Sequence, residues 1–568
     1  MDIKNAVITE LLNMELSIDL NNYKNMFMLS SDYKNGDVCL PCFVLSKELK
    51  VNPNEIANQI ANEVNALVAS NTLVAKAEAV NGYVNFFTKQ SMVTGSVING
   101  ILLYPNTFGK SDIGNGKTYV LDYSSVNLAK YMHIGHLKTT IIGLVLTNIL
   151  KALGYKTVSI NYVGDYGTPF GKMITAYYRW GDDKEIKNHG VDAVQDLYVK
   201  FNREAENDPT LEVEAREWFK KIENGDKEAT KLANWFIELS RGEVERLCNL
   251  LGAKFDSWRG EKYYSDKMQP VIDELNAKNL LKESEGAKIV DLEPYGLGAA
   301  LIQKSDGSSL YLTRDLAAVE DRYKNYKFDN AIYVTDVAQK LHFKQLFKIA
   351  ELLNKPYAGK LQHVAYGRYS LPTGKISSRL GKQALLADIY NAALTKACEV
   401  MKQRGTKVDD FKEVAHKVAV GAISFEAIKN EKVKDTIFDL NESLNFDGET
   451  SPYMQYTYAR LNSVVQKAGR VNLNTADFSD VNNENGFEIV KLLNKYPLVV
   501  MEAFNKMEPC LIVRHLMSIC SEVNKFYNQK RIIENDVVNV NRLAIIKATL
   551  IVLRNGFEIV NIPVINKM

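Results

Sequence analysis

One alternation of predicted strands and helices constrains the fold of this chain more than any other feature. The predicted elements, in chain order, are a strand over 117–123, a helix over 136–153, a strand over 158–163, a strand over 331–334 and a helix over 339–353. Apolar strands that alternate with helices assemble into a parallel, doubly wound sheet. We therefore predict an α/β protein with a Rossmann-like sheet at its centre.

The length of 568 residues exceeds what one hydrophobic core usually supports, so we expect several domains. Residues 1–110 are predicted to form a small α+β module, in which helical periodicity precedes a short aromatic strand at 83–87. Residues 111–408 carry the α/β pattern, which a charged helical insertion interrupts at about 185–285. Residues 409–568 are predicted to be an all-α domain, because helical periodicity dominates there.

Composition and charge narrow the class of protein. The formal net charge is +2, so a nucleic acid would have to bind local basic patches and not a global positive field. The six cysteines are scattered, which argues against a disulfide framework and fits a reducing compartment. No apolar run approaches the roughly 20 residues that span a bilayer, and the N-terminus lacks a basic-then-apolar signal. We expect a cytoplasmic protein with no membrane partner.

The segment Met132-His133-Ile134-Gly135-His136-Leu137 follows the first predicted strand and opens the long helix. Two imidazoles three residues apart lie on one face of a helix, and the N–H groups of a helix N-terminus attract phosphate. The glycine between them leaves room for a base or a ribose to lie against the backbone. Two ordinary histidines at a helix start are the alternative, but the seven histidines in this chain make a chance H-x-G-H match rare. The pattern predicts a nucleotide site.

Polar side chains also follow the first predicted strand. They are Asp122, Ser125, Asn127 and Lys130, and ligands of open α/β sheets bind at the carboxyl ends of strands. Asp122 could accept a cation, and Lys130 could bind a phosphate. Serine and asparagine also favour tight turns for conformational reasons, so the local pattern leaves both interpretations open.

Two later stretches carry further candidate residues. Residues 367–382 are basic and rich in hydroxyl groups, with glycines on both sides, as expected of a mobile loop that contacts phosphate. A solvated basic loop without a ligand is the alternative. Upstream of it, Tyr311 and Asp315 are spaced to share one helix face, and both could point into the same cleft as Asp122.

Together these stretches resemble the arginyl-tRNA synthetases, a family of class I aminoacyl-tRNA synthetases, over nearly the whole chain. The similar blocks are 39–56, 122–140 with the HIGH motif, 164–171, 255–264, 311–315, 333–345 and 452–460. Tyr166 and Pro169 depart from the family pattern within the third block. The resemblance implies an N-terminal module that contacts tRNA, a Rossmann-type catalytic domain and a helical anticodon-binding domain.

The resemblance also implies roles for individual residues. ATP would be held by His133, Gly135, His136, Lys130, Lys375, Ser377 and Ser378, of which His133, His136, Lys130 and Lys375 would be catalytic. Arginine would be held by Asp122, Ser125, Asn127, Tyr311, Asp315 and Gln339. Two carboxylates with several neutral acceptors suit a planar guanidinium, which agrees with this assignment.

One departure from the family pattern concerns the KMSKS loop of class I enzymes. The best match is Lys375-Ile376-Ser377-Ser378-Arg379, in which Ser378 stands where the second lysine belongs. Arginine enzymes often lack this lysine, and a lysine ahead of the HIGH motif is thought to replace it. Lys130 has that position here. Our hypothesis is that Lys130 and Lys375 together stabilise the α-phosphate.

The implied reaction is arginine–tRNA ligation: ATP and L-arginine give arginyl-adenylate, and arginine then passes to the terminal adenosine of tRNA(Arg). Mg²⁺ would come with ATP, and we predict no metal site made by the protein alone. The residues expected to contact tRNA are Tyr83, Asn85, Tyr453 and Arg460, and we expect a monomer. Two alternatives stay open: another H-x-G-H nucleotidyltransferase, or a paralogue that binds RNA without catalysis.

Overall fold

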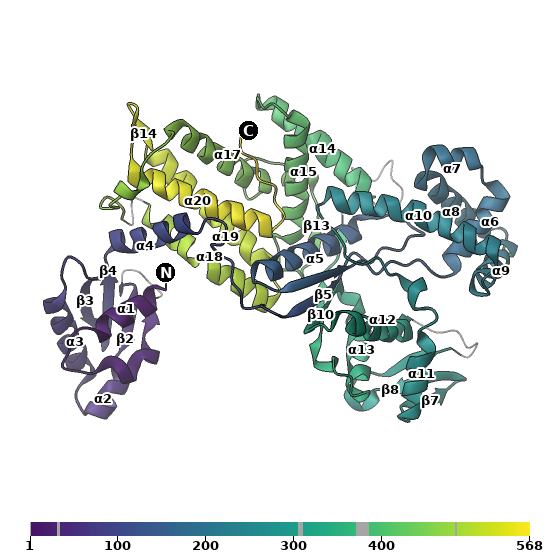
Figure 1. The fold of residues 1–568 in the computed structure, drawn as a ribbon, viewed down its shortest axis with the longest axis horizontal. Helices are drawn as coiled ribbons and strands as arrows, with labels where there is room; N and C mark the ends of the chain where they lie inside the picture. Colours follow the sequence, from purple (N-terminus) through teal and green to yellow (C-terminus); the bar gives the residue numbers. More distant parts are fainter. Residues whose placement is uncertain (1, 31–34, 305–310, 371–384, 483–485) are drawn as a thin grey trace.

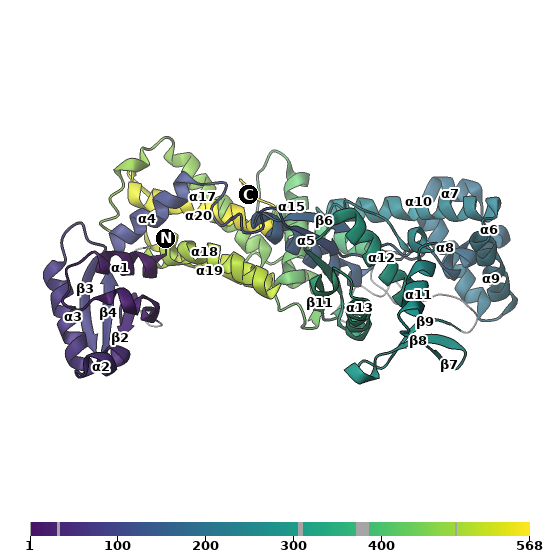
Figure 2. The ribbon, with the colours of Figure 1, turned by 60° about the horizontal axis from the view of Figure 1, so that its bottom comes forward.

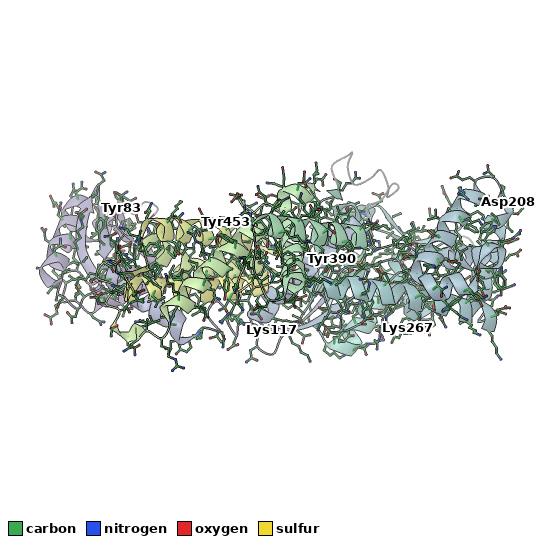
Figure 3. The ribbon with its side chains drawn as sticks, turned by 90° about the horizontal axis from the view of Figure 1, so that it is seen from above. Tyr83, Lys117, Asp208, Lys267, Tyr390 and Tyr453 are labelled. Carbon is green, nitrogen blue, oxygen red and sulfur yellow. The ribbon has the colours of Figure 1, made fainter. Side chains whose placement is uncertain are left out.

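The computed structural model describes residues 2–30, 35–304, 311–370, 385–482 and 486–568. The molecule is elongated, with the N-terminal module at one end and a group of helices at the other (Figure 1). The central sheet and the C-terminal helices lie between these two ends (Figure 1). Seen from above, the labelled Tyr83 and Asp208 mark the opposite ends of the chain's long axis (Figure 3).

A four-stranded parallel sheet forms the centre, in the order β11-β10-β5-β6. Its strands are β5 (Thr118–Asp122), β6 (Lys156–Ile160), β10 (Asn330–Asp336) and β11 (Leu361–Tyr366). The helices that connect or flank them are α5 (Ile134–Ala152), α12 (Tyr311–Tyr326) and α13 (Lys340–Leu352). Most residues of β5 and β10 are buried, as expected of parallel strands covered on both faces. The predicted α/β fold is therefore confirmed.

Helix α5 is buried around almost its whole circumference, because the sheet lies on one side and C-terminal helices on the other. Its approach to β5 is close: a Cβ at Gly143 would lie 2.1 Å from the ring of Tyr123, so only glycine fits there. Lys138 is the exception in this apolar helix, since a lysine side chain is fully buried there.

The N-terminal module is a four-stranded antiparallel sheet in the order β1-β2-β4-β3, covered by helices. Its elements are α1 (Ile3–Leu12), β1 (Met28–Leu29), β2 (Val38–Pro41), α2 (Phe43–Leu49), α3 (Pro53–Leu67), β3 (Val74–Val80) and β4 (Tyr83–Thr88). Asn81 and Gly82 both have positive φ, which gives the tight turn between β3 and β4. The next helix, α4 (Gln90–Leu103), packs against the C-terminal helices α18 (Phe487–Lys506) and α20 (Val540–Ile559).

Helices dominate the insertion after β6. They are α6 (Thr168–Trp180), α7 (Asp183–His189), α8 (Val191–Ala205), α9 (Thr210–Glu223) and α10 (Lys227–Leu250). A small apolar cluster of their own holds α6, α8 and α9 together. After them come α11 (Met268–Ala277) and an antiparallel sheet of β7 (Leu281–Ser284), β8 (Ala287–Asp291) and β9 (Ala299–Gln303), at the lower edge of Figure 2.

The C-terminal part is helical, as predicted. Its further helices are α14 (Leu386–Gln403), α15 (Phe411–Ile428), α16 (Leu440–Ser443), α17 (Ser451–Ala468) and α19 (Cys510–Gln529). Short strand pairs accompany them: β12 (Tyr369–Ser370) with β13 (Thr436–Ile437), and β14 (Ile533–Glu534) with β15 (Val537–Val538). Among the residues that the structure describes, no helix has the length and apolar character needed to cross a membrane.

Candidate active site

A cavity of about 660 Å³ opens where β5 and β10 end and α5 begins. This is the edge of the sheet at which ligands of α/β proteins bind. Its wall is made by Ser124, Ser125, His133, Gly135, His136, Thr139, Val334, Thr335, Asp336, Gln339, Tyr366, Arg368, Tyr369, Ser370, Asp435, Thr436 and Ile437. Five of the predicted site residues are in this wall: Ser125, His133, Gly135, His136 and Gln339.

The two histidines are fixed by the backbone of the helix start. The N–H of Gly135 donates to Nδ1 of His133, and the N–H of His133 donates to Nδ1 of His136, both over 3.1 Å. Each neutral imidazole therefore carries its proton on Nε2. Burial lowers the pKa of both, to about 3 for His136, and the charge of Lys130 further lowers that of His133. The pair thus consists of uncharged Nε2–H donors at the N-terminus of α5.

A strained turn follows β5. Ser124 and Ser125 have φ of 73° and 47°, a left-handed conformation that costs energy for residues other than glycine. Thr139 of α5 holds this turn, because its Oγ1 accepts from the N–H of Ser124 over 3.3 Å. As a result the hydroxyl of Ser125 donates to Oδ1 of Asp122 over 2.9 Å.

Asp122 is already paired with a cation of the protein. Oδ2 of Asp122 lies 2.7 Å from a terminal nitrogen of Arg322, and both side chains are almost completely buried. The guanidinium of Arg322 also lies over the rings of Tyr162 and Tyr333, at 5.2 and 5.6 Å. The charge of Asp122 is therefore compensated inside the fold, and Asp122 is not part of the cavity wall.

Asp315 has a different partner. Its Oδ2 lies 2.7 Å from Nε2 of His342, and the two side chains are 20% and 28% exposed. This contact joins α12 to α13, and Gln339 lies just before α13. Tyr311, one turn ahead of Asp315, is 67% exposed. Among the described residues, Asp315 has this histidine but no lysine or arginine as an ion-pair partner.

A second internal ion pair lies nearby. Glu261 contacts Arg314 over 2.8 Å, with both side chains largely buried. Burial raises the pKa of Glu261 to about 7, with Asp315 and Asp165 adding to the rise and Arg314 opposing it. The nearby carboxylates of Glu261 and Asp122 thus have Arg314 and Arg322 as partners, whereas Asp315 has His342.

The remaining predicted residues around the cavity lie as follows. The Oδ1 of Asn127 accepts from the N–H of Ala129 over 2.9 Å, which shapes the turn ahead of the histidines. Lys130 is exposed to solvent. Lys375, Ser377 and Ser378 lie outside the described residues. The described residues on either side of this loop lie near the cavity. Ser370, before the loop, lines the cavity, and the N–H of Leu386, after the loop, donates to the carbonyl of Met132, next to His133, over 2.9 Å.

The residues expected to contact tRNA lie far from the cavity. Tyr83 and Asn85 are alternate residues of β4 and so share one face of the sheet, where the ring of Phe43 meets that of Tyr83 edge-on at 5.3 Å. Tyr453 and Arg460 lie on α17 and contact α19. The hydroxyl of Tyr453 accepts from Asn524 over 2.9 Å, and Arg460 lies 4.3 Å from the ring of Tyr527. Figure 3 shows Tyr453 between Tyr83 and the centre of the molecule.

Sequence reasoning missed the roles of Arg322, His342 and Lys138. Arg322 lies seven residues after Asp315, two helical turns along the same face of α12, so its place on the face that carries Asp315 was detectable. His342 lies inside the block 333–345 but carried no separate signal. Lys138 lies among mostly apolar residues in the first half of α5, which is the one local hint that it has a buried partner.

Three family models match the chain. The model described as "tRNA synthetases class I (R), catalytic domain" covers residues 97–440, more than half of the chain. The "Arginyl tRNA synthetase N terminal domain" matches residues 1–88, and the "DALR anticodon binding domain" matches 454–568. The three matches follow one another along the chain without overlap.

Individual relatives agree with these matches. The arginine–tRNA ligase of Clostridium botulinum (strain Alaska E43 / Type E3) is 40% identical over 570 residues, which is 100% of both chains. The arginine–tRNA ligase of Clostridioides difficile (strain 630) is 41% identical over 534 residues, or 94% of each chain. The solved arginyl-tRNA synthetase of Thermus thermophilus shares the fold with a TM-score of 0.75 at 22% identity, covering 100% of this chain and 99% of that one.

These matches confirm the resemblance inferred from the sequence blocks, and they argue against another H-x-G-H nucleotidyltransferase. The catalytic match includes the cavity with its histidine pair, and the helical match includes α19 and α20. This chain belongs to the arginyl-tRNA synthetases, the class I ligases that join arginine to tRNA.

Proposed function

We propose that this chain activates L-arginine with ATP in the cavity at the start of α5 and transfers it to tRNA(Arg). The observation that carries the proposal is the pairing of two different groups at one sheet edge. A neutral histidine pair lies at the N-terminus of α5, and the carboxylate of Asp315 on α12 has His342, but no internal arginine, as its ion-pair partner. The histidine pair suits a nucleoside triphosphate, and the carboxylate of Asp315 suits a guanidinium.

At the ATP end, His133 and His136 donate through Nε2 to phosphate or ribose oxygens. Their lowered pKa keeps them uncharged at neutral pH, so they orient ATP by hydrogen bonds without a charge that would have to be desolvated. Gly135 leaves the backbone open between them. Lys130, with Lys375, Ser377 and Ser378 from the loop, supplies charge and donors to the phosphates, which replaces the missing second lysine of the KMSKS motif.

At the arginine end, Asp315 binds the guanidinium of the substrate. His342 holds this carboxylate in place, and Tyr311 and Gln339 add contacts from α12 and the start of α13. On the opposite side Ser125 lines the cavity, and Asp122 and Asn127, which lie behind this wall, would contribute through the turn after β5. Because Arg322 already compensates Asp122, the charge that selects arginine belongs to Asp315. A site with such a buried hydrogen-bonding requirement rejects analogues that lack the group by about 10⁴–10⁵.

The chemistry then proceeds by positioning and charge stabilisation. A carboxylate oxygen of arginine attacks the α-phosphorus of ATP, a new P–O bond forms, and the bond to pyrophosphate breaks. Mg²⁺ that accompanies ATP would neutralise part of the leaving charge. The carboxylates in the cavity wall already have backbone partners: Asp336 accepts from Ala338 and Asp435 accepts from Arg368. In the second step a hydroxyl of the terminal adenosine of tRNA attacks the arginyl carbonyl, and AMP leaves.

For tRNA we propose contacts at both ends of the helical region. Tyr83, which is half-buried, and Asn85, which is only 5% exposed, would meet the tRNA from the face of β4 that they share. Tyr453 and Arg460 would meet the anticodon from α17. We keep the division at residues 110 and 408 as part of this proposal, together with a monomeric, cytoplasmic enzyme. Aromatic rings and arginine on one surface suit unstacked bases.

The decisive experiment is ATP–pyrophosphate exchange with each of the 20 amino acids, with and without total tRNA, followed by charging of tRNA with labelled arginine. Of the 20 amino acids, we expect exchange with arginine and with no other, and we expect charging of a subset of the tRNA. A His133→Asn, His136→Asn double variant purified in the same way should be inactive, which excludes a contaminating host enzyme. Exchange with a different amino acid would overturn the proposal, and RNA binding without any charging would favour the non-catalytic paralogue.

A further inference from the structure

Lys138 lies in α5 two residues after His136 and is only 1% exposed. Its ammonium donates to two backbone carbonyls from distant parts of the chain, that of Gly367 over 3.0 Å and that of Lys434 over 2.9 Å. The ring of Tyr369 lies 5.7 Å from the same nitrogen. A lysine buried this deeply is rare, because burial of an ammonium is costly unless its donors are satisfied.

The two carbonyls belong to neighbouring backbone segments. We name residues 367–370 the inner segment and residues 432–438 the crossing segment. Backbone hydrogen bonds of 2.8–2.9 Å join them at Gly367 to Lys432, Arg368 to Thr436 and Ser370 to Phe438. The segments are so close that a Cβ at Gly367 would lie 2.4 Å from the carbonyl oxygen of Val433. Lys138 is bonded to both segments where they meet.

These segments form one wall of the cavity, and α5 forms another. Arg368, Tyr369 and Ser370 of the inner segment line the cavity, as do Asp435, Thr436 and Ile437 of the crossing segment. His133, Gly135 and His136 line it from the start of α5. The ammonium of Lys138 is therefore a direct link between the two walls on either side of the proposed ATP.

We propose that Lys138 is a positioning residue for adenylate formation, which fixes the inner and crossing segments against the histidine helix at the spacing that ATP requires. The inference rests on the proposed function. Lys138 touches neither substrate nor reacting atoms, so it acts through the walls that it joins. Displacement of a catalytic group by about 1 Å can lower the rate about 100-fold, so a small change in this spacing would lower the rate of adenylate formation.

The surroundings of Lys138 support this role. Burial lowers its pKa to about 8, while the charges of Asp435, Asp336 and Glu508 oppose that shift. The ammonium is thus charged at neutral pH, and a charged donor binds carbonyl oxygens more strongly than a neutral one. Methionine fills a similar volume but would leave both carbonyls without this donor.

The test compares Lys138→Met with Lys138→Arg in ATP–pyrophosphate exchange at saturating arginine and tRNA, with arginine affinity measured separately by calorimetry. We expect Lys138→Met to lower kcat/KM for ATP by at least about tenfold while the Kd for arginine changes less than about twofold. Lys138→Arg should recover most of the loss, because it keeps a charged donor. Lys355→Met is the matched control: the Lys355 side chain is 15% exposed, its ammonium also has two oxygen partners, in Glu274 and Glu320, and it is not part of the cavity wall.

Three results would overturn the proposal: a kcat/KM for ATP within about threefold of the unmodified chain, no recovery by Lys138→Arg, or an equal loss in Lys355→Met. If Lys138→Met does not fold, Lys138→Gln is used with the same criteria, since it keeps one N–H donor. If the unmodified chain shows no exchange with arginine, the proposed function fails, and the calorimetric Kd for ATP of the same variants still decides whether Lys138 fixes the ATP walls.

Discussion

At the proposed ATP end of the site, four consecutive residues at the start of α5 supply the polar groups, whereas at the proposed arginine end the side chains come from β5, α12 and α13. The first end is held by backbone N–H groups that fix the two imidazoles. The second is held by ion pairs within the protein, Asp122 with Arg322 and Asp315 with His342. The difference teaches that a phosphate site can be built by a single helix start, while a site for a cation needs distant charges to be balanced against one another.

The strongest test of this difference is Asp315→Asn. If Asp315 carries the charge that selects arginine, the variant should lose about 10³-fold in kcat/KM for arginine, equivalent to about 4 kcal/mol, with little change in the KM for ATP. Steady-state exchange with each substrate varied in turn measures both. Asp321→Asn is the control, because Asp321 is another ion-paired carboxylate of α12, with Arg259 as its partner at 3.2 Å. Equal losses in the two variants would show that Asp315 has no special role.

The second test breaks the internal pair behind the arginine end. Arg322→Met leaves the buried carboxylate of Asp122 without its partner, so we expect a loss of about 3 kcal/mol of stability. Adding Asp122→Asn should recover part of that loss, because no buried charge then remains unpaired. Denaturant unfolding of the unmodified chain, Arg322→Met, Asp122→Asn and the double variant gives a double-mutant cycle. Additive losses would mean that the pair is not coupled.

The third test concerns the ATP end. Lys130→Ala should lower kcat for adenylate formation by at least about tenfold, or about 1.4 kcal/mol, if Lys130 replaces the second loop lysine. The Kd for arginine should not change, since Lys130 serves the other end of the cavity. Lys117→Ala provides the control, because Lys117 is equally exposed but precedes β5 at the opposite end of that strand. A loss smaller than tenfold would remove Lys130 from this role.

The smallest expected effect is a pH dependence at the histidine pair. Burial lowers the pKa of His136 to about 3 in the folded chain, below its unfolded value, so the unfolded state binds more protons between these two pKa values. Stability from this group is thus present above the unfolded pKa and falls as the pH drops. Between pH 6.5 and 5.5 we expect about 1 kcal/mol of loss that is absent in His136→Asn. Unfolding curves of both chains at the two pH values measure it, and parallel losses would contradict it.

Much of the ATP end was predictable from the sequence because its geometry is local. A strand, a turn and a helix start in consecutive residues bring His133 and His136 to one face whatever the rest of the chain does. The α/β alternation and the helical C-terminal part followed from periodicity for the same reason. The identity of the family rested on such local blocks, and the family matches confirm it.

The arginine end was decided by tertiary structure. The sequence suggested that Asp122 and Asp315 share one cleft, but it could not show that Arg322 pairs with the first and His342 with the second. These pairs depend on how separate elements pack, since the partners are 200 and 27 residues apart in the chain. Lys138 is the clearest case. From the sequence it is a lysine in a mostly apolar helix, and only the packing of α5 against 367–370 and 432–438 supplies the two carbonyls that make its burial favourable.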